Sequence, residues 1–182
     1  MNHSTPIEDA WKFCPMCAAA RSAEQGNPFS CAACGYTHYF SPFTAVGALI
    51  VDEQEQMLFI VRGKDPGKGK LGLPGGFVDA GEMAEQALVR EIREEVGLEI
   101  VRYEFLASFP NSYAFSGVIC PVTDLFFVAH VASLSNFQLQ EGEIDDWKLL
   151  PVANVGPQDL AFDTHWKAIQ AYAGQRNGEP RT

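Results

Sequence analysis

Three glutamates, Glu91, Glu94 and Glu95, constrain this sequence most, because their spacing places three carboxylates within about one turn of a helix. Residues three or four positions apart share one side of a helix, so these side chains are expected to converge. Like charges at this spacing repel each other and favour a bound cation. Carboxylate oxygens select hard divalent ions, so Mg²⁺ or Mn²⁺ is the expected metal. A solvated, charged helix face is the alternative interpretation.

Neighbouring residues support a helix with a metal-binding side. Arg90 adjoins the glutamates and is expected to orient a carboxylate, and Gly97 is expected to end the helix. The sequence predicts a helix over 82–96, with a weak start signal at Asp79. Its expected buried stripe is Ala84, Ala87, Leu88, Ile92 and Val96.

Gly75 and Gly76 precede this segment and permit a close approach of the backbone to a ligand. Gly76, Glu82, Arg90 and Gly97 also stand at fixed offsets from the three glutamates. The whole pattern resembles the Nudix box, Gly-x5-Glu-x7-Arg-Glu-U-x-Glu-Glu-x-Gly-U with U aliphatic, and every specified position matches. The resemblance implies a Nudix hydrolase with an α/β/α sandwich and a mixed sheet.

Two Cys-x-x-Cys pairs lie near the N-terminus: Cys14 with Cys17, and Cys31 with Cys34. This spacing is typical of a structural zinc site with four thiolate ligands. A pair of disulfides is the alternative, but no secretory signal precedes the cysteines, so we expect a reducing, cytoplasmic compartment. Cys120 lies in an apolar stretch and is expected to be a buried, inert thiol.

These features predict three segments: a zinc ribbon over 11–40, a Nudix hydrolase domain over 41–173 and a flexible tail over 174–182. The arrangement is similar to that of the NADH pyrophosphatases, in which a four-cysteine ribbon directly precedes the catalytic domain. The segment 108–113 departs from their Ser-Gln-Pro-Trp-x-Phe-Pro-x-Ser element, since it reads Ser-Phe-Pro-Asn-Ser-Tyr.

Apolar and β-branched runs predict the remaining elements. Segments 45–51 and 57–61 are expected to form a hairpin, and 100–109 and 122–131 are expected to be strands joined by a long loop over 111–121. A closing helix is predicted over 162–173. His165 within it is expected to be structural.

Charge and hydropathy narrow the function. The net charge of −10 argues against general binding to nucleic acid, which depends on Lys and Arg. No apolar run approaches the roughly eighteen residues of a membrane span. An anionic substrate must therefore be received by the metal and a few local cations.

The resemblance implies roles for individual residues. Glu91, Glu94, Glu95 and the carbonyl of Gly76 are expected to hold the catalytic metal. Either Glu94 or Glu143 is expected to act as the general base. Glu143 begins a Glu-x-x-x-Trp segment found in many Nudix proteins, in which this glutamate often serves as an additional metal ligand or base, and plain surface exposure is the alternative.

Other candidates concern the substrate. Arg62, Lys64 and Lys70 are candidates for neutralising phosphate, with ordinary solvated roles as the alternative. Phe109 and Tyr113 are expected either to stack on a base or to pack under the loop.

The expected reaction is hydrolysis of the pyrophosphate bond of a nucleoside diphosphate linked to another moiety, with release of a nucleoside monophosphate. NADH, ADP-ribose, FAD and nucleoside triphosphates all remain open as substrates, and the family suggests a homodimer.

A nucleotide sensor without turnover is the second hypothesis, although no glutamate of the box is lost. A nucleic-acid-binding ribbon protein is the third, and it lacks the basic face it would need.

Overall fold

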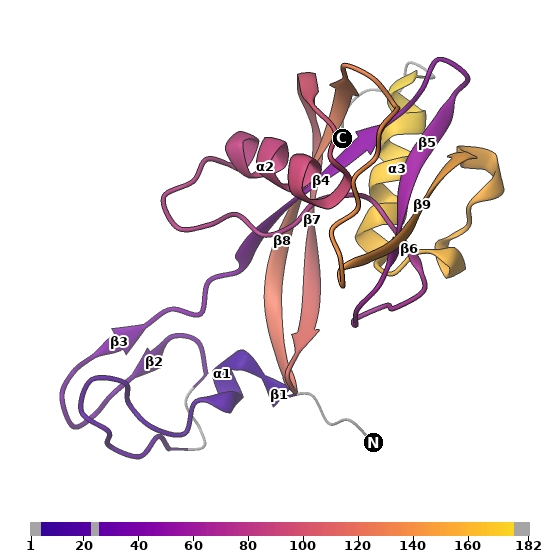
Figure 1. The fold of residues 1–182 in the computed structure, drawn as a ribbon. Helices are drawn as coiled ribbons and strands as arrows, with labels where there is room; N and C mark the ends of the chain where they lie inside the picture. The colour runs from indigo at the N-terminus through magenta and orange to yellow at the C-terminus, as the bar shows by residue number, and fades with distance from the viewer. Residues whose placement is uncertain (1–4, 23–25, 177–182) are drawn as a thin grey trace. The chain divides into compact units, whose positions relative to one another are not determined.

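The computed structural model describes residues 5–22 and 26–176, and its contacts group the chain into two compact units (Figure 1). The first unit comprises Met1–Phe43 and Ser112–Val122, and the second comprises Thr44–Asn111 and Thr123–Thr182. The division after Phe43 lies close to the predicted end of the zinc ribbon at residue 40. The first unit additionally takes in 112–122, which the sequence prediction assigned to the hydrolase domain.

The first unit is built from short elements. They are β1 (Thr5–Pro6), α1 (Ile7–Ala10), β2 (Phe29–Ser30) and β3 (Thr37–His38), and β2 pairs with β3 in antiparallel fashion. β1 pairs in parallel with the start of β8 (Val118–Val131). The small core contains Cys14, Phe29, Cys31 and Phe40. So few apolar side chains bury little surface, and a unit of this size ordinarily needs a metal or disulfides for stability.

The second unit contains two sheets flanked by helices. β4 (Phe43–Ile50) pairs with β8, and β7 (Ile100–Phe115) pairs with β8. β5 (Gln56–Arg62) lies between β6 (Leu71–Gly72) and β9 (Ile144–Pro151), antiparallel to both. The sheet that contains β4, β7 and β8 also includes the short strand β1, which pairs with β8 in parallel. This sheet is therefore mixed, as the sequence predicted.

Helices α2 (Ala84–Val96) and α3 (Asp163–Arg176) contribute to two separate core clusters. Alternate residues of a strand point to opposite faces, and β4 shows this directly. Its Ala48 and Ile50 pack in the cluster that contains α2, whereas Leu49 packs in the cluster that contains α3. The second unit is therefore an α+β fold with an apolar core on each side of its strands.

The predicted long loop over 111–121 is wrong. β7 and β8 continue through it and meet at a tight turn at Ser116 and Gly117, both with positive φ (48° and 80°). Two consecutive residues with positive φ are the signature of the turn that joins twisted hairpin strands, and Ser-Gly is one sequence that supplies it. The strands expected over 100–109 and 122–131 are confirmed, but each is longer than predicted.

The hairpin predicted from 45–51 and 57–61 is only partly correct. Both strands form, and Asp52 N–H donates to the carbonyl of Gln56 at the turn. Beyond an isolated bridge between Val51 and Met57, however, β4 and β5 belong to different sheets. The sequence correctly indicated the turn, but each strand finds its hydrogen-bonding partners in distant segments.

Two short 3₁₀ helices, η1 (Val152–Asn154) and η2 (Pro157–Asp159), lead into α3. α3 extends to Arg176, so residues 174–176 of the predicted flexible tail are helical. The rest of that predicted tail, 177–182, lies outside the described residues. Among the helices that the structure describes, none has the length and apolar character needed to span a bilayer.

Candidate active site

The site is organised by α2 and the loop that precedes it. The helix begins at Ala84, two residues later than predicted, because Asp79 and Glu82 form a turn of their own: Glu82 N–H donates to Asp79 O, and Asp79 N–H donates to Glu82 Oε2. Gly97 ends the helix in the left-handed conformation (φ 72°), with its N–H donating to Arg93 O, as expected. The expected apolar stripe is buried, and Ala84 packs at its edge.

Arg90 joins three of the box carboxylates. Its guanidinium contacts both carboxylate oxygens of Glu82 at 2.9 Å, and its Nη1 donates to Glu91 at 2.8 Å and to Glu94 at 3.1 Å. Nη2 also donates to the carbonyl of Phe77 at 3.0 Å. The contacts with Glu82 and then Glu91 raise the pKa of Arg90, and Arg90 in turn lowers the pKa of Glu82. The predicted orienting role of Arg90 has a clear geometric basis here.

Glu91 lies directly against Gly76. A Cβ atom at Gly76 would come within 2.5 Å of the Glu91 carboxyl carbon, so a side chain at this position would force the Glu91 carboxylate to move. The carbonyl of Gly76 accepts a hydrogen bond of 2.8 Å from Val46 N–H, which leaves its second lone pair available. Burial raises the pKa of Glu91, and the neighbouring Arg90 opposes this rise.

Glu95 is almost completely buried, with an exposed fraction of 6%. Its Oε2 accepts a hydrogen bond of 2.7 Å from the backbone N–H of Gly75. Burial raises the pKa of Glu95 to about 8, and the Gly75 hydrogen bond only partly compensates. Gly75 has a φ of 145°, and a Cβ atom there would lie 2.1 Å from the carbonyl oxygen of Val46. Gly75 is therefore required by a backbone contact and by its positive φ, whereas Gly76 leaves room for the Glu91 carboxylate. The predicted close approach of these glycines to a ligand stays a prediction.

Glu143 lies at the start of the β9 segment and faces the box. Its charge contributes to the raised pKa of both Glu91 and Glu95, and its side chain forms an ion pair of 2.6 Å with Lys64. The carbonyl of Glu143 accepts a hydrogen bond of 2.7 Å from Gly63 N–H, which fixes the backbone beside the end of β5. The tertiary structure thus brings Glu143 and Lys64 to the side of the molecule that carries the box.

Arg62 and Lys70 are engaged with the protein itself. Nε of Arg62 donates to Pro66 O at 2.7 Å, and its guanidinium lies 5.1 Å from the centre of the Phe162 ring. The positive charge of Arg62 lowers the pKa of Glu95, which places Arg62 near the box. Nζ of Lys70 donates to Leu160 O at 3.4 Å.

The two aromatic candidates occupy different surroundings. Phe109 packs against Phe126, with ring centres 6.2 Å apart, at the border of the core cluster that contains α3. Of the two roles left open for Phe109, this contact favours packing over stacking on a base. Tyr113 lies on β7 within the first unit, and its stacking role stays a prediction.

The four cysteines form the tightest set of metal ligands. Their Sγ atoms all lie within 4.8 Å of one another, and the separations are 3.7 Å for Cys14–Cys34 and 3.6 Å for Cys17–Cys31. Zn–S bonds of about 2.3 Å in a tetrahedron require S···S distances of about 3.8 Å. In the described part of the chain, no other group of three or more His, Cys, Asp or Glu side chains has its ligand atoms this close together. Nη1 of Arg90 lies between Glu91 and Glu94 and bridges them.

Two further candidates, Arg21 and Cys120, lie in surroundings that give them no clear chemical role. Arg21 lies over the rings of Phe29 and Phe40, so this cation of the ribbon is packed against aromatic rings. Cys120 is half-buried, and burial raises the pKa of its thiol, which disfavours a nucleophilic thiolate.

Sequence reasoning missed two contacts that shape the site. Glu82 was recognised as part of the motif and as the first residue of the predicted helix, but its ion pair with Arg90 was not predicted. This contact depends on the turn that Glu82 forms before α2. The bond from Gly75 N–H to Glu95 depends on how the loop folds back onto α2, and no local pattern reports it.

Comparison with known proteins defines the class. The NUDIX domain profile matches residues 41–172. The chain is 35% identical over 145 residues to the ADP-ribose pyrophosphatase of Methanocaldococcus jannaschii, covering 79% of this chain and 80% of that protein. It is 32% identical over 174 residues to the NAD-capped RNA hydrolase NudC of Stutzerimonas stutzeri, covering 93% of this chain but only 58% of NudC.

A solved structure supports the NUDIX fold. The NUDIX domain of Shewanella oneidensis NrtR, complexed with ADP ribose, superposes with a TM-score of 0.62 at 27% identity, covering 75% of this chain and 89% of that domain. Together with a box in which every specified position is present, these matches define the chain as a pyrophosphohydrolase. It belongs to the NUDIX family.

Proposed function

We propose that this protein hydrolyses the pyrophosphate bond of a nucleoside diphosphate linked to another moiety, in the manner of an ADP-ribose or dinucleotide pyrophosphatase. The complete set of box side chains, with Gly76 fitted against Glu91, carries the proposal. The relative from M. jannaschii is named for ADP-ribose, and its match covers most of both chains. The expected product is a nucleoside monophosphate.

The donor set of the box fits Mg²⁺ or Mn²⁺, since Glu91, Glu94, Glu95 and the Gly76 carbonyl offer only oxygen atoms. When bound, the divalent ion neutralises phosphate charge and lowers the pKa of the attacking water. Arg90 holds Glu91 and Glu94 in place through hydrogen bonds to both. Gly75 N–H fixes the orientation of Glu95.

A carboxylate must accept the proton of the water, and Glu94 and Glu143 are the candidates. The Glu94 side chain is half exposed (51%), and Glu143 is held by Lys64. Lys64 is proposed to leave Glu143 for a phosphate when substrate enters, since an exposed ion pair contributes little stability. Zinc in the cysteine cluster is proposed as structural.

The substrate is proposed to be a small dinucleotide or nucleotide sugar. Several relatives are named NAD-capped RNA hydrolases, but this chain spans only 57–58% of the length of those from Stutzerimonas and Pseudomonas. The net charge of −10 disfavours a long RNA body. That the protein does not bind nucleic acid, and that it is a cytoplasmic homodimer, both stay predictions.

The test is a substrate panel of ADP-ribose, NADH, NAD, FAD, nucleoside triphosphates and a NAD-capped oligonucleotide, each with Mg²⁺ or Mn²⁺. Glu94→Gln and Glu95→Gln are the active-site variants, and Glu99→Gln, just beyond the helix, is the matched control. Hydrolysis of one small diphosphate by the wild type and by Glu99→Gln, with loss of at least about a hundredfold in both active-site variants, supports the proposal. Faster turnover of the capped oligonucleotide than of every small compound would contradict it.

A nucleotide sensor is the second candidate, because the similar NrtR domain was solved with ADP ribose bound. Isothermal titration of ADP-ribose to the wild-type protein separates the two functions. Tight binding without release of nucleoside monophosphate in the presence of either metal would favour the sensor over the enzyme.

A further inference from the structure

Residues 101–105, near the start of strand β7, lie at an edge of their sheet. In the segments that the structure describes, β7 pairs only with β8. Along 101–105, the edge of β7 that faces away from β8 therefore presents backbone N–H and C=O groups without a strand partner among the described segments, and such an edge is a template for pairing with another chain. The stretch 101–105 lies wholly within the second unit and forms the start of this edge.

One face of this stretch is apolar and exposed. Val101, Tyr103 and Phe105 alternate along the strand and are 64%, 39% and 47% exposed. Tyr103 and Phe105 both contact Phe127 edge to face, with ring centres 6.1 Å and 5.7 Å apart, so the stripe continues from the core cluster that contains α2.

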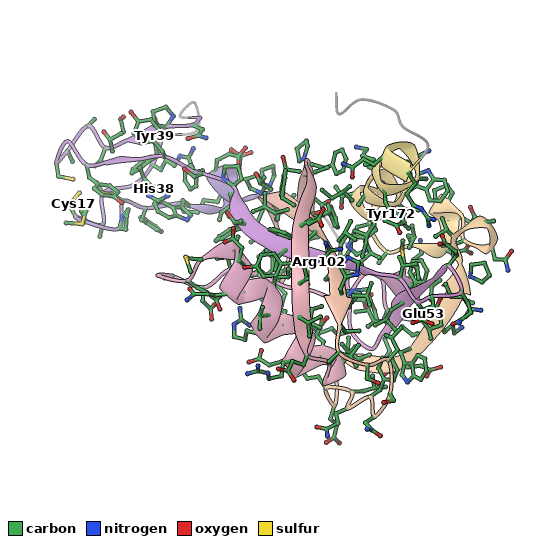
Figure 2. The ribbon with its side chains drawn as sticks, turned by 90° about the horizontal axis from the view of Figure 1, so that it is seen from above. Cys17, His38, Tyr39, Glu53, Arg102 and Tyr172 are labelled. Carbon is green, nitrogen blue, oxygen red and sulfur yellow. The ribbon has the colours of Figure 1, made fainter. Side chains whose placement is uncertain are left out.

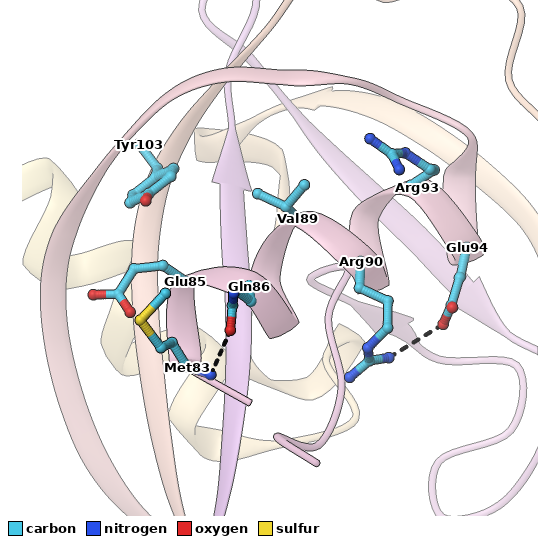
Figure 3. Close-up of a pocket in the computed structure, with 8 residues that line it drawn as sticks. All are labelled: Met83, Glu85, Gln86, Val89, Arg90, Arg93, Glu94 and Tyr103. Carbon is cyan, nitrogen blue, oxygen red and sulfur yellow. Dashed lines mark hydrogen bonds and ion pairs between the residues drawn. The ribbon is translucent and has the colours of Figure 1, made fainter. Parts of the chain in front are cut away.

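The apolar stripe extends into a groove beside α2. Tyr103 lines this groove of about 440 Å³ together with Met83 and Val89 and with polar side chains of α2 that include Arg90 and Glu94, and Figure 3 shows its ring across from the start of the helix. Met83 is itself 59% exposed. Exposed apolar surface that continues over a strand and a helix is unusual unless a partner covers it.

The opposite face of the stretch carries two charges of opposite sign. Arg102 and Glu104 are both well exposed and lie 3.1 Å apart (Figure 2 shows Arg102). The stretch reads Val-Arg-Tyr-Glu-Phe, so reversing its direction keeps an apolar residue at each end and an aromatic residue at the centre, while Arg and Glu change places. The segment is thus complementary to an antiparallel copy of itself.

We propose that residues 101–105 pair in antiparallel fashion with the same segment of a second copy of this chain, with the two-fold axis at Tyr103. In this register Arg102 lies opposite the partner's Glu104, and Val101 lies opposite the partner's Phe105. Cross-strand neighbours of opposite charge and apolar character stabilise a sheet. The interface is isologous, as a two-fold dimer requires.

Charge selects this register over its neighbours. A shift of two residues in either direction would place Arg102 opposite the partner's Arg102, or Glu104 opposite the partner's Glu104. Parallel pairing in register would oppose both like-charged pairs. Like charges directly opposite destabilise a sheet, so only the register centred on Tyr103 satisfies both charges.

The experiment measures the association of the full-length protein by sedimentation velocity over a range of concentrations. Arg102→Glu and Glu104→Arg each place like charges opposite one another twice in the dimer. Each variant is expected to raise the dimer dissociation constant by about tenfold or more. Mixing the two variants restores opposite charges, and the mixture is expected to associate as well as the wild type does.

The control is Glu53→Arg, which changes an exposed charge at the β4–β5 turn by the same amount (Figure 2). It is expected to leave association unchanged, and equal thermal midpoints for all variants would show that folding is intact. A wild-type protein that is monomeric at every concentration would overturn the proposal. So would a dimer that both single variants leave intact, or a mixture that fails to recover association.

Discussion

The backbone N–H of Leu73 donates a hydrogen bond of 3.1 Å to Nδ1 of His165, which ties α3 to the loop that enters the Nudix box. Two residues further on, Gly75 N–H donates to Glu95. A histidine on the last helix therefore helps to fix the backbone that holds a carboxylate of the site. The structural role expected for His165 has a specific basis in this bond.

This contact predicts an acid-sensitive fold. Burial, and secondarily the charge of Arg62, lowers the pKa of His165 to about 3 from an ordinary value of 6.5. Between pH 6.5 and pH 3 the unfolded chain binds a proton at His165 that the native state does not bind. The free energy of unfolding contributed by this group is therefore fully present above pH 6.5 and is lost as the pH falls toward 3. We expect the urea midpoint to decline between pH 7 and pH 5.

The matched variants are His165→Asn and His165→Leu. Asn keeps an acceptor for Leu73 N–H without a titrating ring, so its midpoint should decline less over this pH range. Leu removes the acceptor and should cost about 1–3 kcal/mol at pH 7, since a buried N–H is left unsatisfied. An identical pH dependence in the wild type and His165→Asn would rule out His165 as the sensitive group.

Replacing the two glycines of the loop by alanine should have different effects, a loss of activity at Gly76 and a loss of stability at Gly75. Gly76→Ala pushes against the flexible Glu91 carboxylate, so activity should fall by about tenfold or more with little change in the thermal midpoint. Gly75→Ala meets the backbone carbonyl of Val46 at a positive φ, so it should destabilise the fold by more than about 1 kcal/mol. Paired measurements of kcat and thermal unfolding distinguish these outcomes, and equal destabilisation by both variants would contradict them.

Metal binding should depend on pH through Glu95. Its pKa of about 8 means that the carboxyl is largely protonated at neutral pH without metal, whereas a metal ligand must be deprotonated. Affinity for Mn²⁺ should therefore rise as the pH increases from 6.5 to 8.5, with release of a proton. Calorimetry in buffers of different ionisation enthalpy detects this proton.

Glu95→Gln is the corresponding control, because it retains an oxygen atom but has no proton to release. It should bind Mn²⁺ more weakly and with a flatter dependence on pH. Proton release by Glu95→Gln as large as that of the wild type would assign the proton to another group.

Zinc should be needed for the folding of the first unit, whereas the second unit should fold without it. Cys31→Ser is expected to abolish stoichiometric zinc and to expose Phe29 and Phe40, because the small core of this unit contains two of the four ligands. Cys120→Ser should retain zinc, since Cys120 lies outside the cluster. Zinc analysis with hydrogen exchange tests this, and normal protection of residues 26–40 without zinc would contradict it.

Local sequence patterns determined much of this protein because their physical causes are local. The offset of three and four residues places the glutamates on one side of α2, Gly97 ends that helix, and the Cys-x-x-Cys spacing brings four thiols together. The shared helix face of the glutamates and the clustering of the four cysteines were therefore predictable, and metal binding at the box stays a prediction.

The tertiary structure decided whatever depends on contacts between distant segments. It separated β4 and β5 into different sheets, placed Arg90 between Glu91 and Glu94, and brought His165 to Leu73 across 92 residues. Burial raised the pKa of Glu95, and burial is a property of the whole core. Spacing along the chain reports which residues can share a helix face, whereas the electrostatics and strand partners arise only after the chain has packed.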